Sequence, residues 1–215
     1  KHQHTTAISH CRRRFVRGLA AGAATLGLAL ALTACGDEPG DESQTVQTAS
    51  DGSQFNQSDV DFATNMIPHH AQAVEMVVMA QGRDLSAPVV RLLEDIRTAQ
   101  VPEIETMADW LTAWDEPVPE TSLDHTNAEN GGMEDMSGME GMDGMMSNAE
   151  MAELDAASDA DFEQLWLTMM EQHHAGAITM AQAELESGHN SAALTLAEDI
   201  VAAQTDEIAL METLG

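Results

Sequence analysis

Two copies of one motif, Met-x-x-His-His, carry the side chains that are best suited to metal binding in this chain. In each copy another methionine follows six residues after the histidine pair. Imidazole nitrogen binds copper, zinc, iron and nickel, whereas thioether sulfur is a soft ligand that favours Cu(I) or its heavier analogue silver. The mixture predicts copper as the metal, with the candidate ligands Met66, His69, His70, Met76, Met170, His173, His174 and Met180.

The spacing within each motif is that of one helix face. Successive helical residues are about 100° apart, so Met66, His69 and Met76 share a stripe that would face a core. A single motif of this kind is more often ordinary core, in which a hydrogen-bonded histidine and a methionine fill space. Duplication favours metal binding, because burying four imidazoles without a function costs desolvation at each one. Which histidine of each adjacent pair faces the centre stays open.

The repeat extends beyond the motifs. A shift of 104 residues aligns His69 with His173, and it also aligns Glu103 with Glu207, each of which has a glutamine three residues earlier. These two glutamates are either hydrogen-bond partners of the ligands or solvated residues at the edge of the apolar stripe. A register this long indicates two homologous helical hairpins.

The hairpins are predicted at residues 58–115 and 158–215, and a loop at 116–157 joins them. Ser58 and Ser158, each followed three residues later by aspartate, resemble helix caps. Pro68 inside the first helix predicts a bend, because proline removes one helical hydrogen bond. Each hairpin is apolar on one stripe and would bury it against the other, so we expect an all-α fold: an antiparallel, ferritin-like four-helix bundle.

The loop contains methionine at every third residue among glycines and acids. Such a segment is too rich in glycine to pack as a core, whereas spaced thioethers on a flexible acidic strand can wrap a soft monovalent cation. The alternative is a low-complexity linker in which methionine is incidental. The additional candidate ligands are Met133, Met136, Met139, Met142 and Met145.

The N-terminal segment, residues 1–35, has the features of a bacterial export signal. A basic stretch precedes an apolar run that is too short for a comfortable membrane span, and Cys35 ends a sequence resembling a lipobox. The basic stretch also resembles a twin-arginine signal, and an uncleaved anchor is the alternative. We expect Cys35 to be acylated and residues 36–57 to form a disordered acidic tether, which would leave the protein lipid-anchored on the extracytoplasmic face of a membrane.

Charge and cysteine content narrow the function classes. The chain has 8 basic and 37 acidic residues, and five of the basic residues lie within residues 1–34. A surface this negative repels nucleic acid and attracts cations, although it also suits simple solubility. Both cysteines lie in the signal, so thiolate metal sites and disulfides are not expected in the folded part.

Two other functions are compatible with a helical bundle. A ferritin-like redox enzyme requires Glu-x-x-His on two helices. Glu171 and His174 match this motif once, but Ile67 occupies the position equivalent to Glu171. No Ser-His-Asp, Cys-His or phosphate-loop pattern is present, so we expect no enzymatic activity. A purely structural or interaction bundle is the second alternative, and it predicts no metal uptake beyond weak carboxylate binding.

The paired motifs, the run HHAGAITMA and the Gln-x-x-Glu-Ile segments resemble the family labelled domain of unknown function 305, a ferritin-like helical-bundle group. The resemblance covers about residues 58–215. It implies an exported copper-binding protein linked to copper tolerance, in which the histidines and methionines of the motifs supply the ligands. The expected function is therefore copper sequestration, tolerance or handover outside the cytoplasm, with metal ions and a copper-transfer protein as partners.

Overall fold

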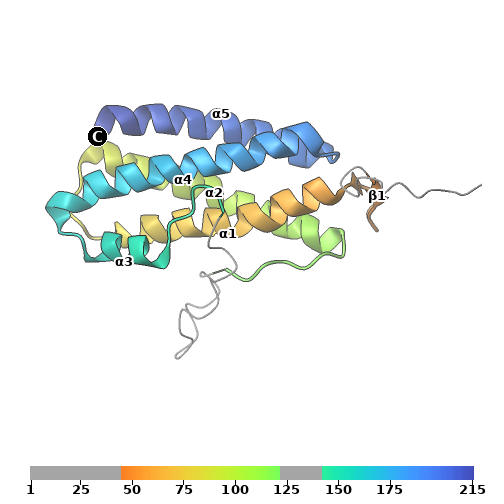
Figure 1. The fold of residues 1–215 in the computed structure, drawn as a ribbon, viewed down its shortest axis with the longest axis horizontal. Coiled ribbons are helices and arrows are strands. Elements are labelled where there is room, and N and C mark those ends of the chain that lie inside the picture. Colours follow the sequence, from red (N-terminus) through yellow and green to blue (C-terminus); the bar gives the residue numbers. More distant parts are fainter. Residues whose placement is uncertain (1–44, 122–141) are drawn as a thin grey trace, which may run out of the picture. The chain divides into compact units, whose positions relative to one another are not determined.

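A computed structural model of the chain describes residues 45–121 and 142–215. This part is all-α apart from one short hairpin, as the sequence predicts (Figure 1). No described helix is both long enough and apolar enough to cross a membrane. The elements are β1 (Gln47–Thr48), β2 (Gln54–Phe55), α1 (Gln57–Met79), α2 (Ala87–Ala113), α3 (Asn148–Ala156), α4 (Asp159–Ser187) and α5 (Ser191–Leu214).

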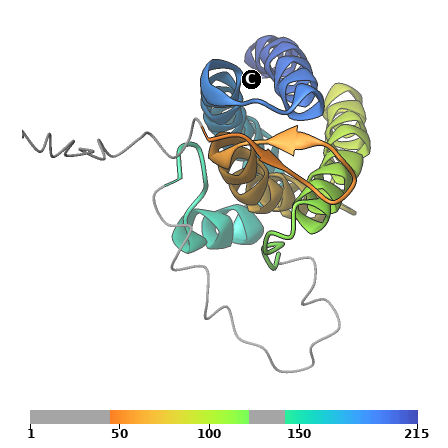
Figure 2. The same cartoon turned by 90° about the vertical axis from the view of Figure 1, so that its right-hand side faces the viewer.

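The four long helices pack as two hairpins. Helix α1 packs on α2 and helix α4 packs on α5, while α1 and α4 join the hairpins. The two helices of each hairpin run in opposite directions, and so do α1 and α4 (Figure 1). Seen along the helices in Figure 2, α2 lies beside α1 and α5 lies beside α4, and α2 and α5 also contact each other. The two motif-bearing helices are thus direct neighbours.

Buried apolar residues form two clusters along α1 and α4. The first cluster lies where α1 ends and α4 begins, and the second lies where α1 begins and α4 ends. The histidine pairs fall between these clusters in both helices, so a polar layer divides the core. Representative members are Met76, Phe162, Trp166 and Met170 in the first cluster and Phe62, Met66, Leu111 and Trp114 in the second.

Helix α1 begins earlier than predicted. Its cap is Asn56, whose side chain accepts a hydrogen bond from the backbone N–H of Asp59, while the Asp59 carboxylate accepts one from the backbone N–H of Asn56. This reciprocal pair is a capping box. The predicted cap at Ser58 is therefore wrong by two residues, because asparagine also serves at this position. Ser158, by contrast, is the residue that precedes α4, as predicted.

Helix α1 continues through Pro68, and α2 likewise contains an internal proline, Pro102. A proline removes a single hydrogen bond and is tolerated where tertiary packing supplies the stability. Pro68 is buried next to His69. The helix therefore contains Pro68 within its length, as predicted, and His69 and His70 after it remain helical.

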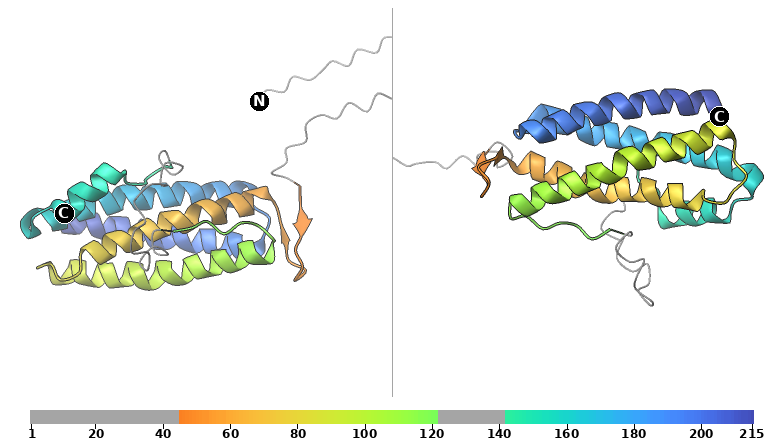
Figure 3. Two further views of the ribbon diagram at one scale, coloured as in Figure 1. Left: turned by 90° about the horizontal axis from the view of Figure 1, so that it is seen from below. Right: turned by 180° about the vertical axis from the view of Figure 1, so that it is seen from behind.

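Part of the predicted acidic tether is structured. Strands β1 and β2 pair in antiparallel register with Gln47 opposite Phe55, and the Phe55 ring stacks on Trp114 with centroids 4.8 Å apart. Residues 47–55 are thus an ordered hairpin beside the second cluster (Figure 3), which corrects the prediction of disorder there. Residues 1–44, including the predicted signal and Cys35, lie outside the described part.

Residues 142–146, which we call the strap, lead into α3 and cross the α1–α4 pair (Figure 1). Met146 at its end is buried in the first cluster, and Ser147 caps α3 with a capping box to Glu150. Arg83 holds the other end of α3, because its guanidinium donates to the carbonyls of Asp155 and Ala157 at 2.7 and 2.8 Å. This part of the predicted loop is therefore attached to the bundle.

Candidate metal centre

His69 and His173 meet at the centre of the polar layer. Their ring centroids are 3.8 Å apart, and neither side chain has any exposed surface. All four ring nitrogens of the two residues lack a hydrogen-bond partner. Buried polar groups are nearly always paired, so four unpaired nitrogens in one place require an explanation.

His70 and His174 lie one residue further along each helix and point toward the outer helices. The Nε2 atom of His70 is 2.8 Å from a carboxylate oxygen of Glu103, and the Nε2 atom of His174 is 2.7 Å from one of Glu207. The sequence left open whether these glutamates bind the histidines or face solvent, and the structure places them as partners. Such a contact fixes the tautomer, leaving Nδ1 as the free nitrogen.

The thioethers flank the histidine layer on both sides. Met76 and Met170 are fully buried in the first cluster, and Met66 is fully buried in the second with Met180 packed against it. Met180 is only partly buried. The motif methionines therefore lie in or against the apolar clusters on either side of the histidine layer.

Two glutamines add further polar groups at this depth. Gln100 and Gln204 occupy equivalent positions in the repeat, one turn before Glu103 and Glu207, and each is almost completely buried. Both side-chain polar atoms of Gln100 and the side-chain oxygen of Gln204 lack a partner. Their spacing before the glutamates was visible in the sequence, but their burial was not.

Burial sets the protonation of the central pair. It lowers the pKa of His69 to about 3, with the neighbouring His70 adding to the effect. It also holds the pKa of His173 well below the ordinary value, and repulsion between two protonated rings so close together adds to this. Both imidazoles are consequently neutral at pH 7, and neutral imidazole is the form that binds a metal ion.

Among the described residues, no three side chains of the His, Cys, Asp or Glu types are grouped so that they could hold a metal ion by themselves. A site in this layer would therefore draw on the methionines as well. Met142 and Met145 of the loop lie on the partly buried strap. The other predicted loop ligands, Met133, Met136 and Met139, fall outside the described residues.

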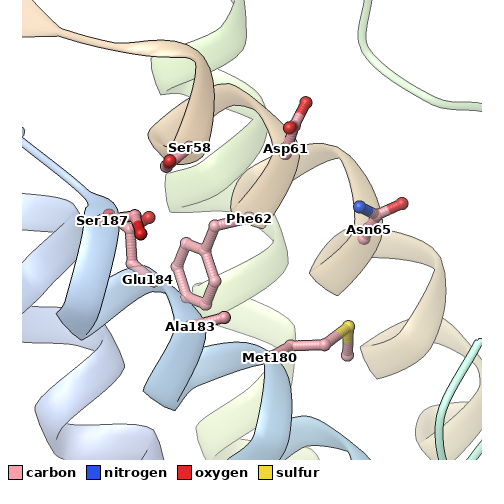
Figure 4. Close-up of a pocket in the computed structure, with 8 residues that line it drawn as sticks. All are labelled: Ser58, Asp61, Phe62, Asn65, Met180, Ala183, Glu184 and Ser187. Atoms are coloured by element: carbon pink, nitrogen blue, oxygen red, sulfur yellow. The ribbon is translucent and has the colours of Figure 1, made fainter. Parts of the chain in front are cut away.

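A cavity of about 220 Å³ lies between the start of α1 and the end of α4 (Figure 4). Glu184 is 2% exposed beside it, and burial raises the pKa of this carboxyl to about 9. If Glu184 were ionised, neither of its carboxylate oxygens would accept a hydrogen bond. When Glu184 is protonated, its carboxyl group donates a hydrogen bond to Asp59. The oxygens of Asp59 already accept backbone N–H groups from Asn56, His189 and Asn190. No sequence pattern indicated this carboxyl pair.

Replacing Glu184 by glutamine is expected to stabilise the protein at alkaline pH and to change little at pH 4.5. The unfolded carboxyl ionises near its ordinary pKa of 4.5, whereas the folded one keeps its proton to about 9. The folded state therefore binds more protons in this window, so wild-type stability falls as pH rises from 4.5 to 9. Thermal unfolding at pH 5 and 8.5 measures the difference, with Glu186→Gln on the exposed face of α4 as control. Equal pH dependence in the two variants would contradict the assignment.

Four long helices around a buried histidine layer, with methionines in the apolar clusters on either side, define the class: an all-α protein with unpartnered imidazole nitrogens in its core. The model of the family described as Domain of unknown function (DUF305) matches residues 59–215. The chain belongs to this family.

Solved structures share this fold. A DUF305 protein from Streptomyces coelicolor, described as secreted, is 31% identical, with coverage of 73% of this chain and 89% of that chain and a TM-score of 0.61. A DUF305 fragment from Deinococcus radiodurans is 28% identical, covering 78% and 97%, also with a TM-score of 0.61. CopM in its Cu(II)-bound form is 27% identical, covering 73% and 94%, with a TM-score of 0.58. No curated protein matches the chain significantly.

Proposed function

We propose that this protein binds copper outside the cytoplasm, for sequestration, tolerance or handover, through the histidine and methionine layer between α1 and α4. The observation that carries the proposal is the contact between His69 and His173, whose four buried nitrogens have no partner. Nitrogens of neutral imidazoles that are buried at a helix interface are suited to bind a metal ion. The metal would take the place of the missing hydrogen bonds.

The donor set supports copper over harder metals. Imidazoles of the central pair suit Cu(II), and the thioethers of Met66, Met76 and Met170 on either side of the layer suit Cu(I) and silver. The structure of CopM with Cu(II), at 27% identity, supports the same metal for this chain. Its structures with Cu(I) and silver, at 24% identity, share the fold.

The chain acts in this proposal as a binding protein and not as an enzyme. Its two hairpins form a ferritin-like antiparallel four-helix bundle, but the layer is built from histidine and methionine, whereas ferritin-like redox sites are built from carboxylates that bridge two metals. Glu103 and Glu207 approach the histidines at Nε2, which suits orientation of the rings.

Export and anchoring are further parts of the proposal. They rest on the signal-like residues 1–35, on Cys35 in the lipobox-like sequence, and on the relative from Streptomyces coelicolor that is described as secreted. A cation-attracting acidic surface on a membrane-anchored protein would collect copper before it enters the cell. Handover of copper would require a copper-transfer protein as partner. The spaced methionines Met133, Met136 and Met139 would add binding capacity for Cu(I) and silver.

Equilibrium dialysis of the purified chain against Cu(II), and against Cu(I) under reductant, tests the function. We expect tight binding of both at neutral pH without turnover of a substrate. Serine at Met133, Met136 and Met139 should lower the capacity for Cu(I) while leaving Cu(II) bound, because thioethers are poor ligands for Cu(II). Uptake of iron with oxygen consumption and no copper binding would instead favour a redox enzyme.

A further inference from the structure

The two halves of the repeat differ at a pair of positions that follow the histidines. Gln72 lies three residues after His69, and the equivalent residue three positions after His173 is Gly176. A step of three residues keeps a side chain on the same helix face, so both positions border the central pair. The strap lies against both of them.

Gln72 binds the strap with both ends of its amide. The amide nitrogen donates to the carbonyl of Met146 at 2.8 Å, and the amide oxygen accepts from the backbone N–H of Met146 at 2.7 Å. Gln72 is 1% exposed, so both hydrogen bonds are buried. Alanine at this position would leave two backbone groups of the strap without a partner.

Gly176 lets the strap approach the backbone of α4. A β-carbon on Gly176 would overlap the carbonyl oxygen of Asp143, and one on Gly144 would lie 2.8 Å from the Cα of Gly176. Gly144 also has φ of +81°, which favours glycine. Two glycines in contact therefore allow a close passage that any other residue at position 176 would prevent.

The strap reaches the metal centre itself. The Asp143 carbonyl lies near the ring of His69 and slightly opposes the pKa decrease that burial causes there. It does not form a well-aligned hydrogen bond, because both nitrogens of His69 remain unpartnered. The strap thus places a backbone oxygen beside His69 and leaves the ring nitrogens free.

We propose that Gln72 and Gly176 are positioning residues that hold the strap as a removable cover over His69 and His173, and that a copper or silver ion reaches the imidazoles when this cover lifts. The inference rests on the proposed function. Because both imidazoles are fully buried, some part of the molecule must move for an ion to enter. Lifting the strap breaks two hydrogen bonds and exposes Met146, whereas separating α1 from α4 disrupts both apolar clusters. The strap is the less costly route.

Two variants test the cover, Gln72→Ala and Gly176→Ala. The first removes both hydrogen bonds, and the second displaces the strap while alanine favours the helix. In the apoprotein, modification of His69 and His173 by diethyl pyrocarbonate should accelerate about thirtyfold in Gln72→Ala, since each of its two hydrogen bonds is worth about a factor of five. His189 is exposed and serves as the internal standard.

In the full chain, entry and release of Ag(I) should both accelerate while the equilibrium affinity changes little, because a cover affects both directions equally.

Two control variants separate the cover from general loosening. Gln182→Ala removes an exposed glutamine of α4, and Ile200→Val lowers overall stability from within the second cluster. If Ile200→Val accelerates modification as much as Gln72→Ala does, or if neither strap variant accelerates it, the cover proposal is wrong. If the strap variants accelerate modification but the wild type binds neither copper nor silver, the cover stands and the proposed function fails.

Discussion

Replacing His69 and His173 together by leucine is expected to lower the affinity for Cu(II) by more than about a hundredfold, because losing a residue that merely orients a ligand already costs about 10- to 100-fold. These two histidines supply four unpartnered buried nitrogens where their rings meet, and His70 and His174 each add one more, Nδ1. Competition between the protein and a chelator of known affinity, followed by electron paramagnetic resonance of Cu(II), measures the change.

The same double variant should make the apoprotein more stable by about 2 kcal/mol, because a buried polar group without a partner costs about 1–3 kcal/mol. Leucine has a similar size and no polar atoms, so it extends the two apolar clusters into one. Urea unfolding in the presence of a chelator measures this gain. Opposite effects on binding and stability are the mark of a functional site, since a merely structural pair would lose stability when removed.

His189→Leu is the matched control for both measurements. His189 is exposed and its backbone, not its ring, contacts Asp59. We expect this variant to retain the wild-type affinity and to change stability by less than about 0.5 kcal/mol. A double variant that still bound Cu(II) like the wild type would exclude the histidine pair as the site.

The helices and the histidine layer were predictable from the sequence because they follow from periodicity. One stripe of Met66, His69 and Met76, repeated 104 residues later, determines which face is buried and that the two faces meet. A duplicated stripe also predicts that His69 and His173 lie at similar depth. The detailed orientation was not predictable, because adjacent histidines on a helix point about 100° apart and only the packed neighbours decide which one is central.

The parts that were missed depend on contacts between segments far apart in sequence. Gln72 binds the backbone of Met146, which is 74 residues away in the sequence, so only the folded structure shows this contact. The raised pKa of Glu184 likewise arises from burial between helices and, after that, from Asp59, which belongs to another helix. The low-complexity composition of the methionine-rich segment gave no indication that residues 142–146 would be held against the bundle.

One signal for the strap was nevertheless present. The repeat aligns Gln72 with Gly176, and a glycine in the middle of a long helix costs about 1 kcal/mol relative to alanine. Such a glycine indicates close approach of another backbone. A break in an otherwise regular repeat is therefore worth as much attention as the residues that repeat.

The glutamates of the outer helices provide the second large effect. Alanine at Glu103 or at Glu207 is expected to lower the affinity for copper by about 10- to 100-fold, because each carboxylate holds the Nε2 of one histidine and thereby orients its Nδ1. The two hairpins are equivalent in this respect. If both supply ligands to one centre, the two single variants should weaken binding by similar factors.

The double variant Glu103→Ala with Glu207→Ala then distinguishes one shared centre from two separate ones. In a shared centre the ligands act as a unit, so the losses of binding free energy in the two single variants would not add. Two independent sites would each lose affinity separately, and the stoichiometry would stay the same. Isothermal titration with Ag(I) and Cu(II) gives both quantities. Glu105→Ala and Glu212→Ala, which remove exposed carboxylates from the same two helices, should leave affinity unchanged. Wild-type affinity in the double variant would show that His70 and His174 take no part in binding, and the centre would then reduce to His69, His173 and the flanking thioethers.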